Sequence, residues 1–463
     1  MCGIGVSIDI DWSHFNGANP ARRHLACDSH DGESQPSNLG GLCCRHQRVP
    51  DFSEPRGRSA YVIETLHRQD AVDHRLWDRP LDLCLIDGIA MYIARLANSF
   101  ILKRMPNTGS HHAPDCPSYE PPAEFSGLEQ VLGSAIIEDP ITGETTLKLD
   151  FSMSKNAGRS APFSASRPHD SVVADGTKLS LRSLLHYLWD QAELTRWKPG
   201  FVGKRSWATV RRYLLQAAEN KIARGDALHA RLYIPEVFSV EQREPINARR
   251  LLQWAHAVTT PSVPQPLMLL IAEVKEIVPA HDGFKAVIKH VPDQAFVLDE
   301  QLYSRMRRRF ASELSLWGLA DNLHMVMIAT FSVSNAGIPT IAELSLMPVT
   351  FQWLPIEDAL EQKLIERLVR EGRSFVKELR YNLPPQQALA SAVLIDAGES
   401  PIPLYIAPWS TGREFADSLI QRGKRDDAAP VWFWHTAQQA MPPLPMQIRK
   451  GVGVKVAPAR TSV

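Results

Sequence analysis

The stretch LMLLIAEVKEIV, residues 267–278, decides the fold class of this chain. It opens a series of runs rich in aliphatic and β-branched residues, which continues with FKAVIKHV (284–291), MVMIATFSV (325–333) and IAELSLMPV (341–349). Runs of this composition are typical of β-strands. The amphipathic segment from about residue 299 to 316 predicts a helix between the second and third runs. We therefore expect an α+β layer built on an antiparallel sheet.

Two helices are expected upstream of this layer, at about residues 179–194 and 206–223, because apolar residues recur there at three- and four-residue spacing. Before them, SAIIEDPITGETTLKLDFSM (134–153) places two alternating runs around a Pro-Ile-Thr-Gly turn, which predicts a β-hairpin. We assign residues 126–355 to one α+β middle domain of a multidomain chain.

The C-terminal segment, residues 356–446, shows a regular alternation of elements. Its order of helix, three strands, helix and strand is that of the restriction-endonuclease-like, PD-(D/E)XK, fold. The elements are a helix at about 357–371, the runs FVKELRYN (375–382), ALASAVLID (388–396) and PIPLYIAP (401–408), a helix at about 412–421, and VWFWH (431–435).

In that fold, an aspartate that ends a strand holds magnesium, which activates water and stabilises charge on the scissile phosphate. Asp396 stands at this position, but the next strand, 403–407, carries no acidic residue and no lysine. Glu366 or Glu371 of the preceding helix and Lys377 are candidate substitutes. The alternatives are a metal-dependent nuclease with displaced ligands, which would need magnesium, and a nuclease-like fold without a complete site.

Residues 61–125 hold a cluster of zinc-binding side-chain types around two strand-like runs, MYIAR (91–95) and FILKRM (100–105). A tetrahedral zinc site takes four nitrogen, sulfur or oxygen donors. We expect a zinc-stabilised β-hairpin module, since a closed site of this kind contributes folding energy. Its candidate ligands are Asp82, Cys84, His112 and Cys116, with His111 as an alternative to His112.

The motifs LCLIDG, MYIAR, FILKRMPNTGSHHAPDCPSYEPP and FVKELRYNLPP resemble the uncharacterised bacterial family known as domain of unknown function 1173. The resemblance covers about residue 60 to the C-terminus. It implies an association with plasmids and integrative conjugative elements, and a Cys-x-Cys followed by His-x3-Cys at positions 82, 84, 112 and 116. Position 82 is Asp in this chain, so one thiolate of that pattern is replaced by a carboxylate. The family has no established activity to transfer.

Composition limits the class of protein. The 463 residues are 44% hydrophobic, and 51 Lys and Arg balance 51 Asp and Glu, so any nucleic-acid surface must be local. No apolar run approaches the length of a membrane helix, and the N-terminus lacks the features of a signal peptide. All six cysteines lie before residue 117, which fits reduced thiols in the cytoplasm.

The two ends of the chain are expected to lie outside these domains. Residues 1–60 are rich in polar residues and glycine and predict loop or disorder, and residues 447–463 form a tail. The start Met-Cys-Gly-Ile resembles that of class II glutamine amidotransferases, in which the N-terminal cysteine, here Cys2, is the nucleophile. The other motifs of that family are absent from the sequence, so this alternative depends on four residues.

Two local basic patches could neutralise phosphates, aided by Trp197 or Trp207 stacking on bases. In a helix, three of the arginines of SRMRRRF share one face while Arg307 projects elsewhere. The first patch consists of Lys204, Arg205, Arg211 and Arg212, and the second consists of Arg305, Arg308 and Arg309.

The sequence thus favours a cytoplasmic accessory protein of mobile genetic elements that binds DNA or a DNA-processing protein partner. It would carry a zinc-stabilised hairpin and a nuclease-like domain without a complete site. Whether the chain is an enzyme stays open, because the alternatives are a nuclease that uses Asp396 and an amidohydrolase that uses Cys2. No Walker A motif, Rossmann glycine triplet, zincin motif or Gly-x-Ser-x-Gly is present.

Overall fold

The computed structural model describes most of the chain from Met91 to Ile448. The predictions for residues 1–60, for Asp82 and Cys84, for the helix at 412–421 and for the end of the tail fall outside the described residues. The described ranges are 91–96, 99–104, 108–114, 116, 118–139, 142–155, 177–258, 265–320, 322–383, 389–398, 400–407, 430–437 and 439–448. They divide into two units, one made of residues up to Glu120 with Glu138–Glu144, the other of Pro121–Ile137 and the chain from Thr145 onward.

The described part of the first unit contains the predicted hairpin. Strands β1 (Met91–Leu96) and β2 (Ser99–Arg104) pair antiparallel, with Met91 opposite Arg104. A short 3-10 turn, η4 (Gly109–His111), follows. Gly109 is required there, because a Cβ atom at this position would lie 2.7 Å from the Cβ of Glu120. This close approach fixes the turn that carries the two histidines.

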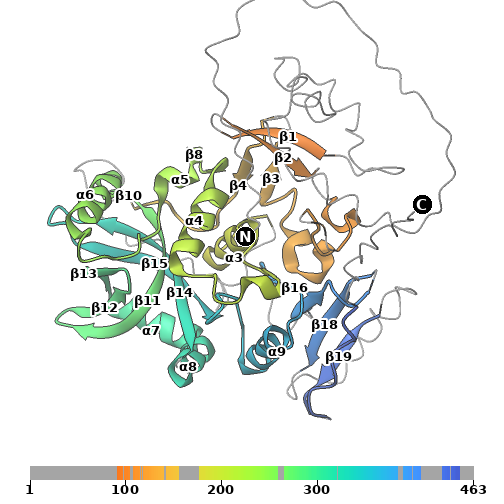
Figure 1. Cartoon of the computed structure of the whole chain (residues 1–463). Coiled ribbons are helices and arrows are strands. Elements are labelled where there is room, and N and C mark those ends of the chain that lie inside the picture. Colours follow the sequence, from red (N-terminus) through yellow and green to blue (C-terminus); the bar gives the residue numbers. More distant parts are fainter. Residues whose placement is uncertain are drawn as a thin grey trace, which may run out of the picture. The chain divides into compact units, whose positions relative to one another are not determined.

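The second unit is built around a barrel, which Figure 1 shows in green and cyan. Its strands are β11 (Met268–Ala280), β12 (Gly283–Ile288), β13 (Val291–Leu298), β14 (Leu323–Val333) and β15 (Pro339–Thr350). Strand β11 pairs with both β12 and β14, β12 pairs with β13, β13 with β15, and β15 with β14. The ring therefore closes. The α+β layer with a largely antiparallel sheet predicted from the sequence is present, and the sequence did not reveal β13, whose parallel pairing with β15 closes the ring.

The length of β11 makes the closure possible. Its first half, from Met268 to Val274, pairs with β14, and its second half pairs with β12 after an irregularity between Val274 and Glu276. Alternate residues point inward. The inner residues of β11, such as Leu270 and Ala272, are fully buried together with residues of the four other strands.

Two helices connect β13 to β14, where the sequence predicted one. Helix α7 (Glu300–Arg309) begins at the N-cap Asp299, whose carboxylate accepts the Leu302 amide hydrogen at 2.7 Å, and α8 (Ala311–Leu319) follows after Phe310. Phe310 is buried with Leu302 and Met306 in the barrel core. The helical segment breaks at Phe310, and this break keeps the Phe310 ring inside.

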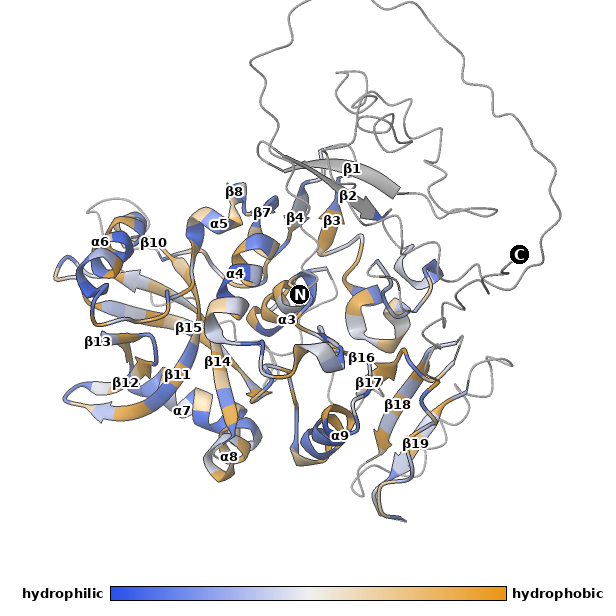
Figure 2. Cartoon of the chain, in the orientation of Figure 1, coloured by the Kyte–Doolittle hydropathy of each residue, from blue (hydrophilic) through white to orange (hydrophobic). Residues whose placement is uncertain are grey.

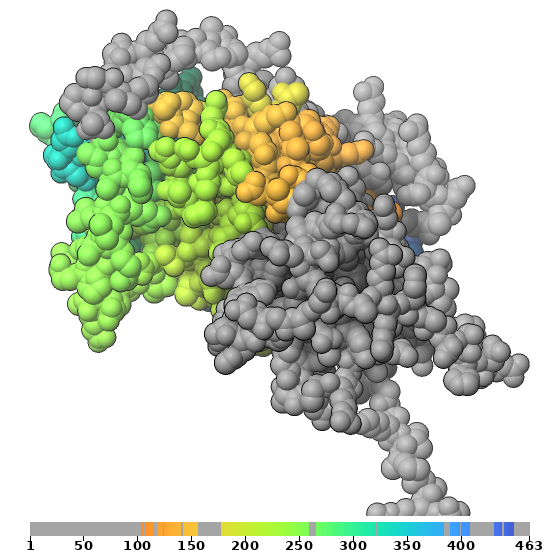
Figure 3. Space-filling view, turned by 90° about the horizontal axis from the view of Figure 1, so that it is seen from above, coloured from red at the N-terminus to blue at the C-terminus, as the bar shows by residue number. Residues whose placement is uncertain are grey.

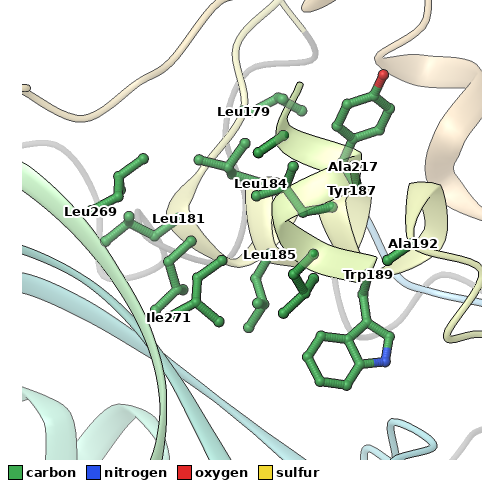
Figure 4. Packing of buried hydrophobic residues seen from close by; sticks show 14 of the residues in the cluster. Leu179, Leu181, Leu184, Leu185, Tyr187, Trp189, Ala192, Ala217, Leu269 and Ile271 are labelled. Atoms are coloured by element: carbon green, nitrogen blue, oxygen red, sulfur yellow. The ribbon is translucent and has the colours of Figure 1, made fainter. Parts of the chain in front are cut away.

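The outer side of β11 and β14 is covered by helix α3 (Leu181–Gln191), which begins at the N-cap Ser180. Figure 4 shows Leu181 and Leu185 of α3 pointing toward Leu269 and Ile271 of β11. Helix α4 (Trp207–Ala218) packs beside α3 in the same hydrophobic core. The two predicted helices are confirmed, with shorter ends than expected.

Smaller elements complete the middle of the chain. Helices α5 (Leu228–Arg231) and α6 (Arg243–Trp254) follow α4, and this helical segment forms a continuous yellow-green and green face in Figure 3. The predicted hairpin strands β3 (Ile136–Glu138) and β4 (Thr145–Leu147) are neighbours in a four-stranded sheet. The remaining short elements are β5 (Ser154–Lys155), β7 (Lys221–Ala223), β8 (Asp226–Ala227), β9 (Leu232–Tyr233), β10 (Gln265–Pro266), η5 (Ala123–Phe125), η6 (Gly127–Gln130), η7 (Pro199–Phe201) and η8 (Ala255–Ala257).

The C-terminal elements follow the predicted order. Helix α9 (Ala359–Arg370) precedes β16 (Phe375–Lys377), β17 (Ala392–Leu394), β18 (Ile402–Ala407) and β19 (Trp432–His435). The first three strands pair antiparallel in sequence, and β19 pairs parallel with β18. Helix α9 carries both hydrophobic and hydrophilic residues in Figure 2, and its Leu364, Ile365 and Leu368 are fully buried.

This sheet is not independent of the middle of the chain. A fifth strand, β6 (Arg196–Trp197), comes from the Pro-Gly segment between α3 and α4 and pairs antiparallel with β16. Trp197, Leu316 of α8 and Leu323 of β14 share a hydrophobic core with α9 and β16–β18. Among the described helices, none combines the length and apolarity needed to cross a membrane.

Candidate functional site

Three basic side chains surround a buried carboxylate on the outer side of the barrel. Glu273 of β11 is 4% exposed, and its carboxylate lies 2.7 Å from Nδ1 of His324 and 2.8 Å from Nζ of Lys289. Nε2 of His290 is 3.8 Å away. His324 is the second residue of β14, whereas Lys289 and His290 follow β12, so two strand ends converge on the middle of β11.

The charges of this group are set by their surroundings. Burial alone would raise the pKa of Glu273, but hydrogen bonds from His324 and Lys289 hold that pKa below its usual range. The group is therefore a carboxylate, and the His324 Nδ1–H donates to it. Burial lowers the pKa of His290, and the nearby Glu273 opposes this effect only in part.

Aromatic rings lie against these imidazoles. The ring of Trp353 is parallel to that of His324, with an interplanar angle of 7° and 4.2 Å between centroids. Phe351 stands 6.0 Å from His324 at 22° and is 62% exposed. Trp207, at the start of α4, stacks on His290 at 5.6 Å and touches Trp353 at the same distance. We call these five rings the ring cluster.

The turn after β15 places the two rings of Phe351 and Trp353. The Trp353 amide donates to the Thr350 carbonyl at 2.7 Å, which closes a tight turn. Trp353 has φ of 61°, a conformation that usually needs glycine. Such a conformation costs a bulky residue about 1–3 kcal/mol, and residues of this kind cluster at functional sites. The strain is balanced by the packing of the indole, which is 4% exposed.

The structure uses two residues of the first predicted basic patch to build the fold. The guanidinium of Arg205 donates to the carbonyls of Leu194, at 2.8 Å, and of Arg196. It also lies over the ring of Trp197, and burial lowers the pKa of Arg205 to about 10. Arg211 donates to the carbonyl of Ile234 at 3.0 Å. These two predicted phosphate ligands are therefore engaged with backbone carbonyls.

The other two residues of this patch face solvent. Lys204 is exposed and directly precedes Arg205, whose guanidinium also contacts the carbonyl of Gln352 at 3.4 Å. Arg212 is exposed too, with its guanidinium 4.7 Å from the centroid of the Tyr213 ring. The predicted Trp197 is fully buried and cannot stack on a base.

The second predicted patch forms the last turn of α7. Arg305, Arg308 and Arg309 are all exposed, and Arg305 and Arg309 act electrostatically on Glu343 of β15. Within the described part of the chain, Arg308 makes no ion pair. Tyr303 of the same helix stacks on Phe284 of β12 at 3.4 Å. The second patch is therefore exposed, and two of its arginines lie close enough to Glu343 to act on its pKa.

The predicted nuclease residues do not come together. Asp396 accepts from Nη2 of Arg373 at 2.7 Å, from the Ser374 amide at 2.7 Å and from Nε2 of Gln447 at 3.0 Å. In the ladder of β16 and β17, Lys377 stands opposite Ala392, four residues from Asp396, a separation of about 13 Å along the strand. Asp396 serves here as the partner of a buried arginine.

The remaining candidates of this site are also paired. Glu371 accepts from Nε of Arg367 at 2.7 Å, and Glu366 accepts from Gln362 at 2.8 Å. Lys377 is 2% exposed, with Nζ 2.9 Å from Glu361 and 2.6 Å from the carbonyl of Glu378. The arrangement around Lys377 is that of a buried ion-pair network.

This network links the FVKELRYN segment to α3 and α9. Nε of Arg380 lies 3.1 Å from Glu357, and the carbonyl of Arg380 lies 2.8 Å from Nδ1 of His186. Asn382 accepts from the Ser183 hydroxyl at 2.6 Å. The polar groups of the segment therefore join β16 to two helices, and burial with nearby charges lowers the pKa of His186 to about 3.

Half of the predicted zinc site is described. His112 and Cys116 are 3% and 1% exposed, and Nδ1 of His112 stands 3.7 Å from Sγ of Cys116. Nitrogen and sulfur ligands of one tetrahedral zinc are about 3.6 Å apart, so this pair fits the metal. Nε2 of His112 is buried and has no hydrogen-bond partner among the described residues. His111 is exposed, which favours His112 as the ligand.

The other half of that site, Asp82 and Cys84, falls outside the described residues, and so does Cys2. Among the residues that the structure describes, no three His, Cys, Asp or Glu side chains gather as a metal site. The sequence reasoning missed Glu273, His324 and Phe351. The sequence signal for Glu273 was a single carboxylate inside the apolar run 267–274, because a buried charge needs a partner.

Comparisons with known proteins identify a family. No curated protein and no solved structure matches the chain. Residues 64–437 match the model of the family described as Protein of unknown function (DUF1173). This match covers more than half of the sequence and includes both the barrel and the C-terminal sheet. The chain therefore belongs to the DUF1173 family.

Proposed function

We propose that this chain is a nucleic-acid-binding protein whose binding surface is the outside of the β11–β15 barrel. It would act as an accessory protein of mobile genetic elements, as the family resemblance implies, on DNA or together with a DNA-processing protein. The observation that carries the proposal is the connectivity of the barrel.

The ring runs through the first, second, third, fifth and fourth strands and back to the first, with the helices between the third and fourth. The third and fifth strands are parallel, and the long first strand pairs with two others. This is the connectivity of the OB-fold, a five-stranded barrel that binds oligonucleotides or oligosaccharides on its second and third strands and adjacent loops. Fold analogy alone does not establish function.

Local chemistry supports nucleic-acid binding over the alternatives. The corresponding strands here are β12 and β13, and Lys285 and Lys289 of the β12 segment are exposed. Arg305 and Arg308 of α7 add positive charge at an end of the same barrel. Cations spaced along such a surface can follow a phosphate backbone. The chain as a whole has no net charge, so this surface would bind locally.

Zinc is the proposed structural cofactor of the first unit. The support is the buried pair of His112 and Cys116, with Cys84 and Asp82 as the further ligands that the sequence offers. A bound zinc would add folding energy to a module too small for a large core. A nuclease-like C-terminal domain is part of the proposal, supported by the order α9, β16, β17, β18, β19, and the engaged Asp396 supports a structural role for it.

The proposal is tested by the salt dependence of binding to a fluorescent oligonucleotide. We expect the logarithm of affinity to fall linearly with the logarithm of salt concentration, because each neutralised phosphate releases counterions. Arg308→Glu should weaken binding and flatten the slope by about one unit. Lys363→Glu on α9 makes the same charge change at an exposed site away from the barrel and should leave binding unchanged. Binding without salt dependence, or no binding, would remove the proposal.

A further inference from the structure

We infer that the Phe351 end of the ring cluster is a stacking subsite for an unpaired nucleobase, so that the barrel binds single strands in preference to duplex. The inference rests on the proposed function and adds the form of nucleic acid. It is carried by the geometry of the rings and not by the fold analogy.

The ring of Phe351 is exposed to solvent. Phe351 is 62% exposed, although a large aromatic ring in a tight turn could be replaced by a polar residue without loss to the core. Its plane is within 22° of the His324 ring, which is itself parallel to Trp353. The exposed ring is therefore nearly parallel to the rings of His324 and Trp353, as in a stacking platform.

Hydrogen bonds and backbone geometry hold the rings next to Phe351 in place. His324 cannot rotate freely, because its Nδ1–H is bonded to the carboxylate of Glu273 at 2.7 Å. Trp353 is held by the turn in a backbone conformation that disfavours a bulky residue. A fold that needed only a turn at this point would be served better by glycine at 353. The buried indole of Trp353 packs in the hydrophobic core, so the surface on which the His324 ring lies is rigid.

Positive charge lies close to the ring cluster. A base on Phe351 would have its sugar and phosphate within reach of the surrounding surface. Lys289, whose side chain is 48% exposed, binds the same Glu273 that orients His324. A duplex cannot present a base face to this ring, because its bases are stacked on each other. An unpaired base can, and stacking on an aromatic side chain tolerates any base.

The experiment compares a short oligothymidylate with an oligonucleotide of equal length and charge in which the bases are replaced by abasic sites. The full chain should bind the first about tenfold more tightly, as expected for one stacked base. Phe351→Leu keeps an apolar side chain but removes the ring face, and should abolish this discrimination. Phe351→Tyr should retain it. Leu252→Ala removes another exposed apolar side chain, on α6, and should have no effect.

The outcomes separate the two proposals. If the chain binds both oligonucleotides equally and with a steep salt dependence, the proposed function stands and the stacking subsite is overturned. The subsite is also overturned if Phe351→Leu discriminates as the unchanged chain does. If the chain binds neither oligonucleotide at low salt, both proposals fall. Thermal unfolding of each variant checks that the fold is intact. We expect the Phe351 variants to unfold at the same temperature as the unchanged chain, because this side chain is exposed.

Discussion

At the scale of single residues, the C-terminal sheet holds Asp396 in an ion pair with a buried arginine. Arg373 and Asp396 have side chains that are 4% and 11% exposed, and the pair is joined by more than one hydrogen bond. Removing one member of a buried pair leaves an uncompensated charge, at a cost of about 3–5 kcal/mol. The same residue in a nuclease would be needed for activity and much less for stability.

We therefore expect Asp396→Ala to lower the free energy of unfolding by about 3–5 kcal/mol in urea denaturation. The double variant Arg373→Met with Asp396→Leu should recover part of this loss, because no buried charge then remains. Glu371→Ala, which removes a partly exposed partner of Arg367, serves as the control with a loss below about 1 kcal/mol. An Asp396→Ala protein as stable as the unchanged chain would contradict the structural role.

A second prediction for a single residue concerns the loss of folding stability at acidic pH. Burial lowers the pKa of His186 from 6.5 to about 3 in the folded chain, so the unfolded state binds a proton that the folded state does not. Stability contributed by the neutral imidazole is present above pH 6.5 and is lost as pH falls from there toward 3. The slope should approach about 1.4 kcal/mol per pH unit. His186→Asn keeps an N–H donor for the Arg380 carbonyl and should remove this slope, as urea titrations at several pH values would reveal.

At the scale of elements, the segment directly after the turn η4 holds two candidate zinc ligands, His112 and Cys116. If His112 and Cys116 bind zinc, elemental analysis of the purified chain should give about one zinc per molecule. His112→Asn or Cys116→Ser should remove the metal and lower the stability of the first unit. His111→Asn, at the exposed neighbour, should leave the metal content unchanged. A metal-free chain, or one in which His111 is the required residue, would refute this assignment.

Local patterns predicted most of these elements. The β1–β2 hairpin, α3, α4, α9 and the order β16 to β18 were predictable because each has an apolar periodicity of its own. The break at Phe310 was not, since the whole segment 299–316 has helical periodicity and only the barrel core decides where Phe310 must point. Strand β6 lies in a Pro-Gly loop whose two strand residues gain their partner from a distant part of the chain.

The candidate site was less predictable than the fold. Arginine-rich stretches predicted the phosphate ligands, but Arg205 and Arg211 satisfy backbone carbonyls, which a count of charges does not reveal. The ring cluster combines side chains from β14, from α4, from the turn that follows β12 and from the turn that follows β15, and no local pattern marks them. Only the closure of the barrel brings them together.

At the scale of the whole molecule, the barrel region and the C-terminal sheet of the second unit share a hydrophobic core. The core around α9 takes Leu316 and Leu323 from the barrel region, and β6 ties the C-terminal sheet to the segment between α3 and α4. A fragment that begins at residue 356 would lose these contacts. The C-terminal sheet and the barrel region therefore pack on each other through this shared core.

The measurement that tests the central claim most directly is photo-crosslinking of the full chain to an oligonucleotide that carries photoreactive thymidine analogues, followed by mapping of the crosslinked peptides. The account predicts crosslinks within residues 267–353, with Phe351 among the modified positions, and their loss in the Phe351→Leu variant. Crosslinks confined to the C-terminal sheet, between residues 375 and 448, would contradict it and place the nucleic acid on that sheet instead.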